Sequence, residues 1–100
     1  MDSEPQPSSA QLRPELSVKF VHYLELKALE GQTELPSFLL ECQTRLEQFS
    51  ACTSALVLKN SLQPGLFLLQ SLWTSEIPAL EWNRLEGWKT GEWSFEVVNG

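Results

Sequence analysis

Residues 18–27 carry the pattern that most restricts how this chain can fold, because apolar side chains recur there at every second position. A period of two is typical of a β-strand with one buried face. We therefore expect a sheet that contains this strand. The expected buried face consists of Val18, Phe20, His22, Leu24 and Leu26.

A helical pattern follows the first strand, after Gly31. Thr33 can cap a helix, and Pro36 falls in the first turn of that helix, where a missing N–H costs little. Apolar positions then recur at steps of three and four over nearly four turns, which predicts a helix with one buried stripe. The stripe consists of Leu35, Phe38, Leu39, Cys42, Leu46 and Phe49.

The second half of the chain predicts two more strands, a helix and a last strand. The strands at 54–59 and 66–73 are joined by Pro64 and Gly65, which read as a hairpin turn. A second helix is expected over 76–86, with a cap at Thr74 and Ser75 and an apolar stripe. A last strand is expected at 93–98. The stripe of the second helix is Ile77, Leu80, Leu85 and Trp88 at its end.

The two expected helix starts resemble each other. The order cap, acid, aliphatic, proline at 33–36 recurs at 75–78. So short a match can also reflect chemistry that suits any helix start. Together with the element order, it favours an α+β fold of the ferredoxin-like βαββαβ type, an antiparallel sheet with two helices on one face.

Length and composition allow one domain. The chain has 100 residues, of which 42% are hydrophobic, so one core is expected over residues 17–100. Residues 1–16 contain prolines, serines and glutamines with no apolar stripe, and they are expected to form a disordered tail.

The charge pattern excludes several classes of function. The net charge is −6 and no basic cluster is present, so a nucleic-acid partner is not expected. No apolar run has the ~20 residues that a membrane-spanning helix needs, and no signal peptide is recognisable, so we expect a cytoplasmic protein. Cys42 and Cys52 match no metal-ligand spacing and are expected to be reduced structural thiols, and no metal or cofactor is expected.

The expected third strand, 66–73, predicts a homodimer. Six of its eight residues are apolar, so both of its faces should be covered. Two helices cover only one face of the sheet, and a second copy is the simplest cover for the other. The alternative is a monomer in which the tail or the last strand folds over that face.

The element order and the segment 64–80 resemble the antibiotic biosynthesis monooxygenase family. In that family a proline-glycine turn leads into an apolar strand that ends in Trp, followed by a Ser or Thr cap and a helix. The resemblance implies a dimeric α+β barrel in which two sheets pack together. Members of that family that are enzymes oxidise aromatic polyketides or open haem, often without metal or flavin, and other members have no assigned substrate. The haem-degrading branch has an Asn on the first strand and a His on the second helix, and neither occurs here.

Five residues are candidates for a functional site. His22 is the single histidine and can act as a catalytic general base, although a buried structural histidine is favoured because no partner can be assigned to it. The candidate substrate-binding residues are Tyr23, Trp73, Trp82 and Arg84. Tryptophans can line an aromatic-binding cavity or serve as core anchors. Arg84 can hold an anionic group or pair with a neighbouring glutamate.

Two functional hypotheses follow from these residues. The first is that the chain binds a small apolar or aromatic molecule in a pocket on the helix side, with cofactor-independent monooxygenase-like catalysis as the enzymatic form of this hypothesis. The alternative is a non-catalytic dimerisation or regulatory module with the same fold. A polar convergence around His22, Tyr23 and Trp73 would favour the first hypothesis, and a pocket filled by side chains would favour the second.

Overall fold

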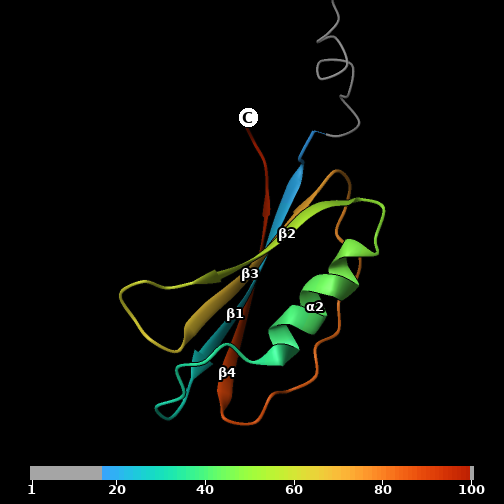
Figure 1. Cartoon of the computed structure of the whole chain (residues 1–100). Helices are drawn as coiled ribbons and strands as arrows, with labels where there is room; N and C mark the ends of the chain where they lie inside the picture. The colour runs from blue at the N-terminus through green and yellow to red at the C-terminus, as the bar shows by residue number, and fades with distance from the viewer. Residues whose placement is uncertain (1–16, 100) are drawn as a thin grey trace, which may run out of the picture.

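The computed structural model describes residues 17–99, and the tail expected at 1–16 lies outside the described residues. Four strands and one helix make up this part of the chain (Figure 1). They are β1 (Phe20–Ala28), α2 (Ser37–Glu47), β2 (Cys52–Lys59), β3 (Leu66–Trp73) and β4 (Trp88–Glu96).

The four strands form one antiparallel sheet in the order β2-β3-β1-β4. In the register of the central pair, His22 on β1 lies opposite Ser71 on β3. On the other side of β1, His22 lies opposite Ser94 on β4. The structure confirms the strand expected at 66–73, whereas β4 begins at Trp88, five residues before the expected start at Trp93.

The expected fold with two helices is wrong. Within the described residues α2 is the only helix, and residues 74–87, where the second was expected, contain no helical turn. The fold is a mostly-sheet α+β domain with one helix rather than a βαββαβ unit. The sequence echo at 33–36 and 75–78 therefore does not mark two equivalent helices.

The connection 74–87 is extended for identifiable physical reasons. Thr74, the expected cap, donates both its backbone N–H and its hydroxyl to the carbonyl of Ala51, at 2.9 and 3.3 Å. The connection must also run the length of β1, because β3 ends beside Phe20 and β4 starts beside Ala28. A nine-residue strand spans roughly 27 Å. The connection would reach only roughly 20 Å if it were helical throughout.

The helix begins later than expected. Residues 33–35 are not helical, and Pro36 is the N-cap with an extended backbone and no side-chain capping bond, so the expected Thr33 cap is wrong. The buried stripe of α2 is Leu39, Cys42 and Leu46. The Gln43 side-chain amide donates to the carbonyl of Ala55 at 2.8 Å and fixes α2 against β2.

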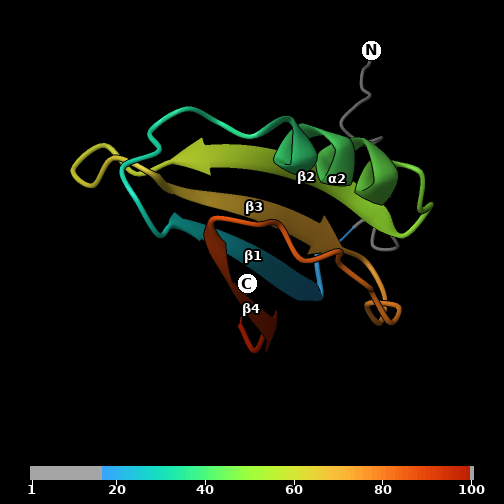
Figure 2. The same cartoon turned by 90° about the horizontal axis from the view of Figure 1, so that it is seen from below.

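One face of the sheet carries the core. Figure 2 shows α2 over β2, and apolar residues of the 74–87 connection pack against the same core cluster. The connection thus replaces the missing helix as a partial cover. The core consists of Leu24, Leu26, Leu39, Cys42, Leu46, Ala55, Phe67, Leu69 and Trp73. No helix in the described part of the chain is long and apolar enough to cross a membrane.

Candidate functional site

His22 lies in the middle of β1 on the face that carries the core. Its side chain is 1% exposed, so the prediction that His22 points toward the helix side is confirmed. Its neighbours Leu24 and Leu26 on the same face belong to the core cluster. A histidine in this position needs a polar partner, because burying an unpaired imidazole N–H is costly.

Glu92 on β4 supplies that partner. The distance between His22 Nε2 and Glu92 Oε2 is 2.6 Å. An ionised carboxylate only accepts hydrogen bonds, so Nε2 carries the hydrogen. Trp82 of the connection donates its indole Nε1–H to the same oxygen at 3.0 Å. The Trp82 ring also stacks on the imidazole, with centroids 5.9 Å apart. These three residues form the His22–Trp82–Glu92 cluster.

The cluster keeps Glu92 ionised. Burial by itself would raise the pKa of the Glu92 carboxyl, but the hydrogen bonds from His22 and Trp82 and the charge of His22 act in the other direction. The net result is a pKa below the ordinary value of 4.5. Nδ1 of His22 is buried and has no hydrogen-bond partner among the described residues.

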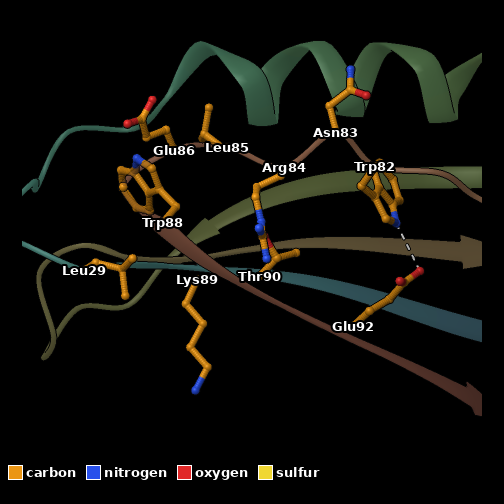
Figure 3. A pocket seen from close by; sticks show the side chains of 11 residues that line it. Leu29, Trp82, Asn83, Arg84, Leu85, Glu86, Trp88, Lys89, Thr90 and Glu92 are labelled. Carbon is orange, nitrogen blue, oxygen red and sulfur yellow. Dashed lines mark hydrogen bonds between the residues drawn. The ribbon is translucent and has the colours of Figure 1, made fainter.

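A pocket opens beside the cluster, between the end of the connection and β4. Its volume is about 680 Å³, within the range of small-molecule sites. Figure 3 shows Arg84 between Trp88 and Trp82, pointing toward Thr90 on β4, and it shows Lys89 pointing away. Glu92 lies at the Trp82 end, so these two members of the cluster form one wall of the pocket.

The structure brings together only part of the predicted site. His22 and Trp82 are in contact, and Trp82 and Arg84 line the same pocket. Trp73 is fully buried, donates its indole N–H to Ser71 at 2.8 Å, and packs on Phe49 as a core residue. Tyr23 follows His22 and therefore lies on the other face of the sheet, where its ring contacts Phe95 and its hydroxyl accepts a hydrogen bond from Gln70.

The chemistry that this arrangement permits is limited by access. Ser71 lies opposite His22, which brings a hydroxyl, an imidazole and the Glu92 carboxylate to one region. Ser71 is 0% exposed and its oxygen accepts from Trp73, so no substrate can reach it as a nucleophile. A general base at His22 would require Trp82 to move aside. Within residues 17–99 no cluster of His, Cys, Asp and Glu could hold a metal ion.

Glu92 is the site residue that sequence reasoning missed. Residues 88–96 alternate, with polar side chains at 90, 92, 94 and 96 and aromatic ones at 93 and 95. The aromatic side of such a strand would be assigned to the core. In the structure the polar side of β4 lies on the helix side, with Glu92 reaching His22. The antiparallel register of β4 on β1 places Glu92 on the same face as His22, and knowledge of this register would have identified Glu92 as a site residue.

The opposite face of the sheet, which we call the open face, carries many apolar side chains, with the polar residues Glu25 and Gln70 among them. Among its residues, Phe95 is 54% exposed, Leu56 48%, Trp93 47% and Leu58 38%. The other members are half-buried, and all of them lie at alternate positions to the core residues on the four strands. The apolar and aromatic members of the open face are Val21, Tyr23, Leu56, Leu58, Leu66, Leu68, Leu72, Trp93 and Phe95.

No protein-family model matches the chain, and no match is found among curated proteins or solved structures. The resemblance to the antibiotic biosynthesis monooxygenase family therefore stays a prediction. The function has to be argued from the residues themselves.

Proposed function

We propose that this chain is a self-associating binding module in which two copies pack through their open faces. The observation that carries the proposal is the exposure of two large aromatic side chains, Trp93 and Phe95, on an uncovered sheet face that also carries exposed leucines on β2. β-Sheets bury such side chains against another layer. Within the described residues, no element covers this face.

The size of the open face supports a stable pair. A large aromatic side chain presents 150–250 Å², so four residues exposed by about half and five half-buried ones offer on the order of 500 Å² per copy. Two copies would then bury roughly 1,000 Å² in total, which lies at the lower limit of specific interfaces and above most crystal-packing contacts.

Charges on the open face support a second copy as the occupant. Glu25 lies on this face of β1, with its carboxyl close to Gly91 on β4. Lys27 and Lys89 lie opposite each other one step further along the same pair of strands. A two-fold interface presents the same surface twice, so Glu25 of one copy can pair with lysines of the other. The apolar surface and both signs of charge are thus self-complementary.

Light scattering across a concentration series tests the proposal. The expected mass at micromolar concentration is twice the 11.4 kDa of one chain. Leu68→Glu places a charge on the open face and should give single chains, because an unpaired buried charge costs several kcal/mol. Leu62→Glu is the matched control, since Leu62 is 93% exposed in the β2–β3 loop, and it should leave the mass doubled. A mass of one chain for the unaltered protein would overturn the proposal.

A further inference from the structure

We propose that the pocket between the 82–88 segment and β4 binds a small planar aromatic monocarboxylate. Arg84 is the cationic residue that would bind the carboxylate. Its side chain is exposed and points across the pocket toward Thr90 (Figure 3), and it has no acidic partner within salt-bridge distance among the described residues. A guanidinium offers several donors in a fixed plane, and the Thr90 hydroxyl lines the same pocket as Arg84, so together they supply donors suited to a carboxylate.

Two indoles make the pocket suited to a flat ring. Trp88 packs on Phe67 at 5.9 Å, and Trp82 stacks on His22. Each indole is therefore held from behind by another ring and is also a lining residue of the pocket. Side chains fixed in this way lose little conformational freedom when a ligand binds. A planar ring can stack on either of them.

The charge balance of the pocket selects a monoanion. Glu86 and Glu92 also line it, against Arg84 and Lys89, of which Lys89 points away (Figure 3). The Glu92 oxygen nearest to His22 already accepts two hydrogen bonds, which stabilise the negative charge of Glu92 where it is. A ligand with a second negative charge would gain repulsion from both glutamates without a second guanidinium to offset it. Phosphate esters are thus disfavoured relative to a carboxylate.

The pocket offers a further polar contact for such a ligand. Glu92 is 43% exposed, and its Oε2 is occupied by His22 and Trp82. Its second oxygen can accept a hydrogen bond from a ring hydroxyl or amine of the ligand. Aromatic carboxylates with a donor at the end of the ring distant from the acid should therefore bind more tightly than unsubstituted ones.

Titration of the full chain with four probes tests this assignment, with tryptophan fluorescence and two-dimensional NMR as readouts. The probes are 2-naphthoate, 6-hydroxy-2-naphthoate, the uncharged 2-naphthalenemethanol and inorganic phosphate. We expect saturable binding of both naphthoates, tighter for the hydroxylated one, with the largest shifts at the indole N–H signals of Trp82 and Trp88. We expect no saturable binding of phosphate and at least tenfold weaker binding of the alcohol.

A pair of arginine variants separates the pocket from nonspecific binding. Arg84→Gln should weaken 6-hydroxy-2-naphthoate at least tenfold and leave the affinity for the alcohol unchanged. Arg45→Gln, on the exposed side of α2 and outside this pocket, should bind like the unaltered protein. Equal binding of acid and alcohol, or shifts confined to the open face, would overturn the assignment. If Arg84→Gln fails to fold, the NMR shifts of the unaltered protein decide. Shifts at Trp82 and Trp88 support the assignment, and shifts confined to the open face overturn it.

Discussion

His22 and Glu92 are 70 positions apart in the chain, and their side chains meet at 2.6 Å across the β1–β4 pair. They are diagonal rather than direct neighbours, because His22 lies opposite Ser94 and Glu92 lies opposite Leu24. Trp82 completes the contact from the connection on the same side of the sheet. The single histidine is therefore held by residues that come entirely from the last quarter of the chain.

Glu92→Gln should lower stability in a way that depends on pH. Because the pKa of Glu92 is lowered in the folded state, its contribution is present above pH 4.5 and is lost as the pH falls through the folded pKa. Glu92 is 43% exposed, so solvent screening limits the loss to about 1 kcal/mol at pH 7. Urea unfolding at pH 7 and pH 3 measures it. Glu96→Gln, further along the same side of β4, is the control and should change stability by less at both pH values. A loss for Glu92→Gln that is equal at both pH values would contradict the account.

Trp82→Ala should expose His22 to solvent. Because His22 is the single histidine, its modification by diethyl pyrocarbonate can be followed by mass spectrometry that assigns the added mass to His22 within its peptide. We expect the modification rate to rise at least tenfold, since Trp82 stacks on the ring and bonds to its partner Glu92. Trp93→Ala, on the open face, should leave the rate unchanged. Equal protection in both variants would show that Trp82 does not cover the histidine.

Glu25→Lys should weaken self-association about tenfold at low salt. The change removes two proposed contacts, one for each copy, and brings like charges together. The double variant Lys27→Glu, Lys89→Glu should be weakened in the same way, and a mixture of the two should associate again. Sedimentation velocity measures all three samples. If Glu25→Lys associates like the unaltered chain, Glu25 does not lie in the interface.

Gly65→Ala should destabilise the fold more than Gly31→Ala, by at least about 1 kcal/mol. Both glycines have a positive φ, +82° and +47°, so the left-handed penalty of roughly 1–2 kcal/mol applies to both. A Cβ at Gly65 would lie 2.5 Å from the carbonyl oxygen of Gln32, whereas one at Gly31 meets nothing within 4 Å. The clash of this Cβ with the backbone adds to the destabilisation of Gly65→Ala and is absent from Gly31→Ala. Equal midpoints in urea would contradict this reading of the hairpin.

The sequence predicted the strands better than the segment 74–87 that packs on the sheet. A period-two pattern located β1, and an apolar run that follows the turn at Pro64 and Gly65 located β3. The same logic failed for 74–87, where Leu80 and Trp82 pack against the core from an extended chain. Apolar residues at mixed steps of two, three and five fit a helix and an irregular cover equally well, and the hydrogen bond of Thr74 to Ala51 depends on a long-range contact.

Strand alternation predicted part of the candidate site. The alternation around His22 correctly assigned it to the helix side, and it also implies that Tyr23 faces away from it. Glu92 could not be assigned, because a period of two separates the faces of a strand without saying which of them meets the second layer. β4 turns its aromatic side, Trp93 and Phe95, away from the core.

An isotope-filtered NOE experiment on an equal mixture of ¹³C-labelled and unlabelled chain tests the open face most directly. We predict intermolecular NOEs between the ring protons of Trp93 or Phe95 in one copy and leucine methyl groups of the open face, such as those of Leu56 or Leu68, in the other. The Leu68→Glu chain, labelled and mixed in the same way, should give none. Absence of intermolecular NOEs from the unaltered chain at millimolar concentration would contradict the claim that the open face pairs with its own copy.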